Sequence, residues 1–232
     1  MTFQILWRCR EHIGMPAMNH SPFSQSDLDR ITEAVRAAES KTSGEIVPYF
    51  VIQSDDYSIA RWRGGVALAA LAVLVTLAFQ MMSKTWLPFG VLELSGAIVG
   101  AFILGILLVR AVPQFRRLML GHALMDHRVS QRASVAFLSE EVFKTRERTG
   151  ILIFLSFFER RVIVLGDSGI NAKVVQSDWQ EIVHTIIKSV KQGKPADGLI
   201  DAIRQCGDLL QQHGVERLRD DTDELSDSLR IG

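Results

Sequence analysis

The sequence predicts one α/β domain that is interrupted by a two-helix transmembrane hairpin. Two apolar runs, residues 64–82 and 89–110, are separated only by a short break around SKTWLP. On either side of them, amphipathic helical patterns alternate with short runs of β-branched and aromatic residues, which is typical of a mixed α/β fold. The flanking parts, residues 23–60 and 113–213, are therefore expected to fold together as one domain.

The segment 64–112 is predicted to cross a bilayer twice. A helix rises about 1.5 Å per residue, so about 20 residues cross a hydrocarbon core of about 30 Å. The alternative is a pair of core helices in a soluble protein. A chain of 232 residues has too little other material to cover two such helices on all sides. The lipid bilayer is therefore the expected partner of this segment.

Charged and aromatic residues at the ends of the apolar runs predict the orientation of the hairpin. Arginines gather before the first run and after the second, whereas the connecting loop carries only Lys84. The positive-inside rule then places both termini in the cytoplasm, as in a two-pass protein of the cell (inner) membrane. Tryptophans also suit the membrane–water interface. The predicted interface residues are Arg61, Trp62, Arg63, Trp86, Arg110, Arg116 and Arg117.

Two features of the second apolar run bear on helix contacts and on function. Gly96 and Gly100 have the Gly-x-x-x-Gly spacing that permits close helix packing, either within the hairpin or between two copies in a homo-oligomer. Glu93 is a carboxylate within a predicted span, which marks a candidate functional residue. It lies near the loop, where headgroups or water can reach it, so a transport path is not expected.

A helix and a strand are predicted before the hairpin. Ser24, followed by Asp27, forms a capping pattern ahead of apolar residues at helical spacing, and Gly44 ends that helix. The run GEIVPYFVIQ then has the composition of a strand, in which Pro48 indicates a sheet edge or a bulge. Residues 1–22 are expected to form a disordered arm.

Helices and a β-hairpin are predicted directly after the membrane segment. The helical pattern from Pro113 to Arg148 breaks near residues 126–130, so two helices or a kinked helix are expected. The run ILIFLSFFERRVIVLGD predicts two strands joined by a tight turn around residues 158–160. Strands this apolar require cover on both faces.

Two further helices can supply that cover. Ser177 and Gln180 predict a capping box at the start of the first, and the second begins after Pro195. The remaining residues, 214–232, include six acidic residues and few large apolar ones. They are expected to form a disordered acidic tail.

The order and motifs of these elements resemble the TPM domain family. The resemblance covers about residues 24–54 and 130–213, and its most specific part is TGILIFLS followed by RRVIVLGDSGI. It implies a small α/β/α sandwich. For some soluble members it also implies acid phosphatase activity and binding of a divalent cation, calcium or magnesium. The chain resembles a bacterial, membrane-anchored branch in which the hairpin is inserted into the domain.

Carboxylates beyond the predicted strand ends are the candidate metal ligands. Asp167 follows the last strand within GDSG, and Asp55 and Asp56 follow the first. Hard cations prefer oxygen ligands of this kind. If the first strand is parallel to its neighbour, the three carboxylates lie near one edge of the sheet. The alternative is that Asp167 and Ser168 only form a turn, as these residue types commonly do.

No standard catalytic motif accompanies these carboxylates, so no catalytic residue is assigned. The sequence lacks GxSxG, P-loop and HExxH patterns. A formal net charge of zero gives no electrostatic reason to expect a nucleic acid partner. The expected function is an interaction or assembly module at the membrane surface, with an unknown membrane or cytoplasmic protein as partner. The alternative is a metal-dependent, acid-phosphatase-like hydrolase that uses the strand-end carboxylates.

Overall fold

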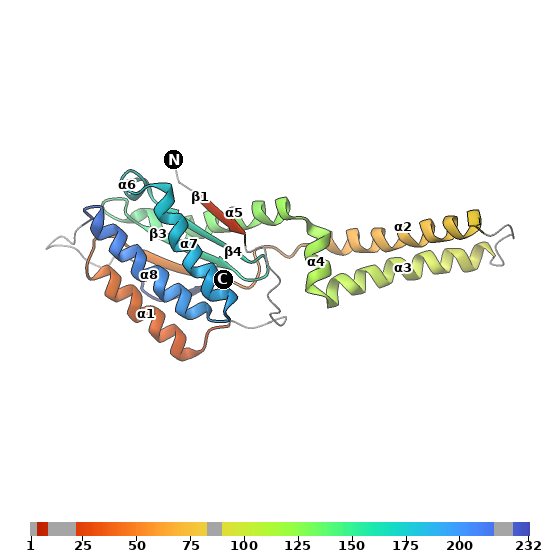
Figure 1. Cartoon of the computed structure of the whole chain (residues 1–232), viewed down its shortest axis with the longest axis horizontal. Helices are drawn as coiled ribbons and strands as arrows, with labels where there is room; N and C mark the ends of the chain where they lie inside the picture. Colours follow the sequence, from red (N-terminus) through yellow and green to blue (C-terminus); the bar gives the residue numbers. More distant parts are fainter. Residues whose placement is uncertain (1–3, 9–21, 83–89, 216–224) are drawn as a thin grey trace. The chain divides into compact units, whose positions relative to one another are not determined.

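The computed structural model describes residues 4–8, 22–82, 90–215 and 225–232, and it divides into two compact units. The α/β unit comprises Met1–Ser54 and Asp126–Gly232, and the helical unit comprises Asp55–Met125. The helical unit is thus inserted in the sequence of the α/β unit. Figure 1 shows the elements of both.

The α/β unit is built on a mixed sheet, five-stranded in the described part of the chain, with the order β1-β4-β3-β2-β5. β2 is parallel to β3 and to β5, whereas the β3–β4 and β4–β1 pairs are antiparallel. Every residue of β2, β3 and β4 is buried. The strands are β1 (Gln4–Arg8), β2 (Ile46–Val51), β3 (Ile151–Ser156), β4 (Arg161–Gly166) and β5 (Arg230–Ile231).

Helices cover both faces of this sheet, which confirms the α/β/α sandwich (Figure 1). One face carries α1 (Gln25–Glu39), α7 (Gln176–Lys191) and α8 (Pro195–Gln212), and the larger hydrophobic cluster lies beneath them. On the other face, residues 126–139 of α5 (His122–Ser139) cover a smaller cluster. Neighbouring strand residues point to opposite faces, so Phe50 belongs to the larger cluster and Val51 to the smaller.

The predicted β-hairpin is confirmed. β3 and β4 pair from Ile151 with Gly166 to Ser156 with Arg161. The turn between them closes at Arg160, which has a left-handed backbone with φ of 55° and donates its N–H to the Phe157 carbonyl. A local apolar–charged–apolar pattern was therefore enough to locate this turn.

The predicted edge position of Pro48 holds only locally: β5 pairs beyond β2, but only at Tyr49 and Phe50, so no described strand pairs with Pro48 on that outer edge. On that edge the Ile46 N–H donates to Glu39 Oε1 at 2.7 Å, and the Phe50 carbonyl accepts from the Gly232 N–H at 3.0 Å. Residues two apart in a strand direct their N–H groups to the same side, so the Pro48 nitrogen faces this edge too. β5 pairs with β2 at Tyr49 and Phe50. A missing donor at Pro48 therefore interrupts no ladder hydrogen bond.

The expectation of a disordered N-terminal arm is wrong for Gln4–Arg8, which form β1 beside β4. The sequence there, QILWR, is short but rich in residues that favour strands. Without β1, β4 would present an open edge, and a short β-prone run can satisfy its backbone groups. The rest of the arm, residues 1–3 and 9–21, lies outside the described residues.

The expectation of a disordered tail is wrong for residues 225–232. Arg230 and Ile231 form β5, and Leu225 and Leu229 pack against the two hydrophobic clusters. Charged contacts add to this: Arg230 Nε lies 3.0 Å from a Glu140 carboxylate oxygen. A few apolar residues at the right spacing therefore hold the segment despite its acidic composition. Residues 216–224 lie outside the described residues.

The break between the two helices after the hairpin lies at Gly121 and not near residues 126–130. α4 (Pro113–Leu120) ends there, and α5 begins at His122 and continues without interruption to Ser139. Gly121 has φ of 70°, which glycine adopts without a steric penalty. A short 3₁₀ helix, η1 (Val142–Lys144), follows α5.

One of the two predicted capping boxes is present. Ser24 Oγ accepts the Asp27 N–H at 3.2 Å, and Asp27 Oδ2 accepts the Ser24 N–H at 3.0 Å. The box predicted at Ser177 and Gln180 is wrong, because α7 begins at Gln176 with Val175 in the cap position. The Ser177 hydroxyl instead donates to the Asp178 carboxylate at 3.3 Å.

Replacing Ser24 by alanine is expected to lower the free energy of unfolding by about 1 kcal/mol, because α1 loses its cap.

Hydrogen bonds from the Ser24 side chain and backbone hold the pKa of the Asp27 carboxyl below its ordinary value. The stability that Asp27 supplies is therefore present above its unfolded-state pKa, and it is lost as the pH falls through the lower folded-state pKa. Denaturant titration of Asp27→Asn against wild type should show a deficit at pH 7 that shrinks at pH 2. A constant deficit would contradict this.

The helical unit consists of two long apolar helices and α4. α2 (Ser58–Met82) and α3 (Val91–Ala111) pack against each other, and α4 packs against both (Figure 1). Their most apolar 18-residue windows have a mean hydropathy of 2.2 and 2.3, and 6% of each window is buried. Both are long and apolar enough to cross a membrane. At the start of α3 the Glu93 carboxylate accepts the Gly90 N–H at 2.8 Å, so it acts as a helix cap.

α2 and α3 approach most closely at Gly64 and Gly105. A Cβ atom built on Gly105 would lie 2.3 Å from the Gly64 carbonyl oxygen, and one on Gly64 would lie 2.3 Å from Val109 Cγ2. Nothing in the described residues lies within 4 Å of a Cβ built on Gly96 or Gly100. Of the two predicted roles for Gly96 and Gly100, packing within the hairpin is therefore wrong.

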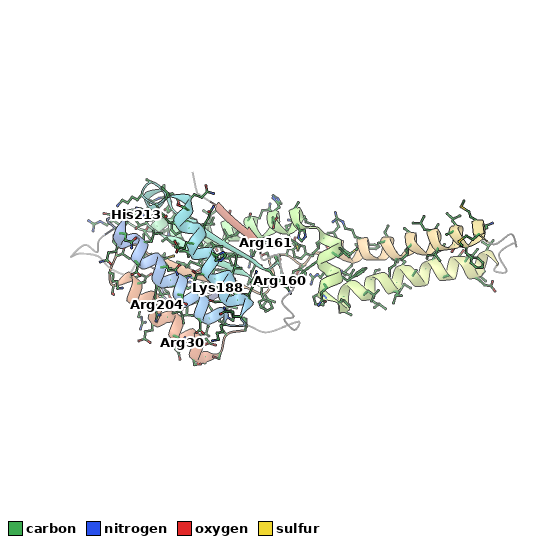
Figure 2. The ribbon with its side chains drawn as sticks, in the orientation of Figure 1. Arg30, Arg160, Arg161, Lys188, Arg204 and His213 are labelled. Carbon is green, nitrogen blue, oxygen red and sulfur yellow. The ribbon has the colours of Figure 1, made fainter. Side chains whose placement is uncertain are left out.

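Two buried residues at the β3–β4 turn contact the residues of the α/β unit that lie next to the inserted unit. Glu159 accepts hydrogen bonds from the Ser54 N–H at 2.8 Å and from the Ser156 hydroxyl. Arg161, labelled in Figure 2, places its Nε 2.5 Å from Asp126 Oδ1. Ser54 and Asp126 are the α/β unit's residues on either side of the inserted unit. One tight turn therefore holds the two residues of the α/β unit between which the helical unit is inserted, and we call this cluster the turn clamp.

Candidate functional site

A cavity of about 400 Å³ opens beside α5, and we call it the α5 groove. A helix about 10 Å wide is narrower than several strands spaced about 4.8 Å apart, so one helix leaves part of a sheet face uncovered. The volume falls in the range of small-ligand pockets, about 300–1,000 Å³. Aromatic and aliphatic side chains form much of the wall, together with one charged pair. The lining residues are Ser134, Phe137, Leu138, Phe143, Arg148, Leu165 and Asp167.

Asp167 is the predicted site residue that lines the groove. It follows β4, is buried, and its Oδ1 accepts the Ser168 N–H at 2.6 Å as the cap of α6 (Ser168–Asn171). Arg148 Nε lies 2.9 Å from Oδ2 of the same carboxylate. The charge of Asp167 is therefore balanced by a guanidinium within the protein.

The loop between η1 and β3 positions Arg148. The Arg148 backbone is left-handed, with φ of 58°, and its carbonyl accepts the Gly169 N–H at 2.9 Å. The guanidinium donates to the Phe143 carbonyl at 3.1 Å and lies 5.8 Å from the centre of the Phe143 ring. These contacts hold a half-exposed side chain against the buried Asp167.

The GDSG sequence is a helix cap packed on this loop. A Cβ atom built on Gly169 would lie 2.2 Å from the Glu147 carbonyl oxygen, so only glycine allows the loop to approach this closely. Of the two interpretations given to Asp167 and Ser168, a local structural role matches their contacts. The same contacts hold Asp167, which is one member of the charged pair that lines the groove.

The three predicted metal ligands do not follow strands at one edge of the sheet. β2 is parallel to β3, but β4 is antiparallel to β3. Asp167 therefore follows β4 at the end of the sheet where β2 begins, whereas the chain leaves β2 toward Asp55 and Asp56 from the other end. The predicted convergence failed because it assumed that β4 ran in the same direction as β2.

Asp167 also does not fit a calcium or magnesium ion. Its Oδ2 faces a cationic side chain and its Oδ1 is engaged by a backbone N–H. Among the residues that the structure describes, no group of three or more His, Cys, Asp or Glu side chains could hold a metal ion. The groove offers apolar surface and the paired charges of Arg148 and Asp167.

Arg148 and Phe143 were missed by the sequence analysis, although the β-hairpin contained a usable signal. In an antiparallel hairpin, the residue before the first strand lies beside the residue after the second. The Asp167 N–H indeed donates to the Gly150 carbonyl at 2.9 Å. A basic residue shortly before Gly150 could therefore have been expected next to Asp167. The contribution of Phe143 depends on a 3₁₀ turn that has no clear local pattern.

The predicted membrane-interface residues lie in the helical unit and form two groups. Each member of the first group makes a polar or ring interaction, and the members of the second are exposed. Trp86 lies outside the described residues. The first group is Arg63, which is also exposed, with Arg116 and Arg117, and the second is Arg61, Arg110 and Trp62, whose ring lies beside that of Phe102.

Comparisons with known proteins agree with this fold. The TPM domain family matches residues 122–209. The chain is also similar to the NMR structure of the BA42 protein from the psychrophilic bacterium Bizionia argentinensis. The TM-score is 0.56 at 19% identity, covering 94% of this chain and 100% of that chain, and at this identity the likeness is one of fold. A comparison with curated protein sequences gave no match.

Proposed function

We propose that this chain, which carries a TPM domain over residues 122–209, is an integral membrane protein. It would present the domain at the bilayer surface as an interaction or assembly module. The helical hairpin is the anchor. The α5 groove receives a protein partner. The chain joins the domain to the anchor at two points, and the turn clamp holds the residues of the domain at both.

The exposure of α2 and α3 carries the first part of the proposal. A core helix of a soluble protein is mostly buried, whereas 6% of the most apolar window of each of these helices is buried. Their exposed side chains include Leu74, Val75 and Leu107. Two neighbouring helices with this surface would be insoluble in water, and a bilayer is the solvent that suits them.

Cysteine labelling tests the anchor and its orientation. The chain has two cysteines, and a Cys9→Ser background leaves only Cys206. Burial raises the pKa of the Cys206 thiol to about 12, so it should not react in the folded protein. Lys84→Cys should react with an impermeant maleimide on intact cells, and Gln212→Cys only after permeabilisation. Labelling of Gln212→Cys from outside would contradict the proposed topology. Release of the chain from membranes by alkaline carbonate would contradict the proposed anchor.

The composition of the α5 groove supports a protein partner. Phe137, Phe143 and Leu165 offer apolar surface, and Leu138 on the rim is 61% exposed. Arg148 adds one directional polar contact. Apolar pockets with a few fixed polar groups are typical recognition sites, and aromatic and arginine side chains are enriched where partners bind. A partner segment with an apolar side chain beside an acidic one matches this groove.

Site-specific photo-crosslinking tests the groove. A photoreactive amino acid at Ser134, which lines the groove, should give a discrete adduct in membranes, and one at Glu181 on α7 should not. Adding Leu138→Arg should abolish the adduct by placing a charge on the rim. Val175→Arg is the matched control, because Val175 is 59% exposed in the same unit but does not line the groove. Equal loss with both variants would contradict a specific groove.

The phosphatase alternative is resolved by the same preparation. Purified full-length chain is assayed on p-nitrophenyl phosphate with calcium or magnesium, beside Asp167→Ala. If the chain is an interaction module, it should show no hydrolysis of the phosphoester that depends on Asp167. Activity that is lost in Asp167→Ala while the circular dichroism spectrum is unchanged would replace the proposal with a hydrolase.

A further inference from the structure

The contacts between α2 and α3 define which residues lie at the same level of the hairpin. Gly64 approaches Gly105 and Val109, and Gly65 approaches Phe102. The two helices are antiparallel, so residue numbers rise along α2 as they fall along α3. Arg61 therefore lies level with Arg110, about 4.5 Å beyond the Gly64 contact.

This level marks the end of the apolar surface. From Val66 to the end of α2 at Met82 the helix rises about 24 Å, close to the thickness of a hydrocarbon core. Trp62 is 64% exposed and its ring lies 6.0 Å from that of Phe102, an arrangement that suits the edge of a bilayer. Arg61 and Arg110 then stand at headgroup level when the hairpin spans a membrane.

Two other arginines at the base of the hairpin make hydrogen bonds within the helical unit. Arg63 Nη1 donates to the carbonyl groups of Met119 and Leu120 at 3.2 and 3.3 Å, at the end of α4. Arg116 Nη2 donates to the Asp56 carbonyl at 2.7 Å. Arg61 and Arg110 are exposed, as Arg63 is, but neither side chain makes such a hydrogen bond to a described residue. Their charge is available to the surroundings.

Charge at this end of the unit is predominantly positive. Five arginines, Arg61, Arg63, Arg110, Arg116 and Arg117, lie at the base of the hairpin. The described carboxylates of the unit are Asp55 and Asp56 near the base and Glu93 at the far end. A positive excess at headgroup level complements a lipid with a negative headgroup, and guanidinium groups bind phosphate well.

We propose that Arg61 and Arg110 bind the headgroups of anionic phospholipids, so that the anchor prefers a negatively charged leaflet. This rests on the proposed function, because it requires α2 and α3 to span the bilayer. Juxtamembrane basic residues contribute about 1 kcal/mol each near an anionic surface, which is about five-fold in affinity for each arginine. The preference should weaken as salt increases.

Native mass spectrometry of the full chain in detergent tests this directly. The protein is titrated with phosphatidylglycerol or with phosphatidylcholine of the same acyl chains. Wild type should bind phosphatidylglycerol at least ten-fold more tightly, and Arg61→Gln with Arg110→Gln should reduce the preference to two-fold or less. Arg63 and Arg116 are left unchanged because they support α4.

A charge-matched control separates a site from general electrostatics. Arg30→Gln with Arg204→Gln removes two exposed arginines of the α/β unit, both labelled in Figure 2, and should keep the full preference. Equal losses in the two double variants, or no preference in wild type, would overturn the proposal. Membrane retention after carbonate treatment is measured in parallel. If wild type stays in the membrane but shows no lipid preference, only this inference is contradicted. If carbonate releases wild type from the membrane, the proposed anchor itself is contradicted.

Discussion

Asp126→Asn is expected to lower the free energy of unfolding of the α/β unit by about 3 kcal/mol. The side chain of its partner Arg161 is 3% exposed, and Arg161 Nη2 has no hydrogen-bond partner among the described residues. Asparagine keeps the shape of Asp126 but removes its charge, which leaves a buried guanidinium without compensation. Denaturant titration monitored by tryptophan fluorescence measures the loss.

A second substitution distinguishes lost charge compensation from lost packing. Asp126→Asn combined with Arg161→Met removes the buried charge as well, so the double variant should be more stable than Asp126→Asn alone. The exposed pair of Arg30 and Asp197, separated by 2.7 Å, provides the control. Asp197→Asn should cost less than about 1 kcal/mol, because water screens that pair. Additive losses in the double variant would contradict the assignment.

Gly105→Leu is expected to destabilise the hairpin by about 3 kcal/mol or more, because a side chain there meets the backbone of Gly64 at 2.3 Å. Backbone atoms cannot rotate away as a flexible side chain can. The two helices must therefore separate along their length. Titration of the detergent-solubilised chain with sodium dodecyl sulfate, followed by the loss of helical contact, measures the change.

The same helix offers a matched control for this experiment. Gly100→Leu introduces the same side chain where nothing in the described residues lies within 4 Å of the new Cβ. It should leave the stability of the hairpin near that of wild type. Equal destabilisation by both substitutions would show that helix propensity or lipid exposure, and not contact with Gly64, sets the effect.

The elements that could be predicted from sequence are those with a long local pattern. The apolar runs, the β3–β4 hairpin and the capping box at Ser24 each lie within a few turns of chain and agree with the structure. β1 and β5 could not be predicted in this way, because five and two residues carry too little pattern. Their formation depends on open strand edges that exist only after the sheet has formed.

The candidate site was predictable only in part for a similar reason. Asp167 was found because it follows a strand, but Arg148 reaches it only through the antiparallel direction of β4. Gly96 and Gly100 had the right spacing for helix packing, whereas Gly64 and Gly105 make the contact. Spacing marks a face of a helix that permits close approach. Which face is used depends on how the two helices cross.

The turn clamp has a mechanical consequence. Glu159 and Arg161 contact Ser54 and Asp126, the residues of the α/β unit next to the insertion, and Arg161 is also the first residue of β4. Asp167, in the wall of the α5 groove, follows the last residue of the same strand. A displacement of Ser54 or Asp126 would therefore reach the α5 groove through one six-residue strand. β4 thus links the turn clamp at one of its ends to the wall of the α5 groove at the other.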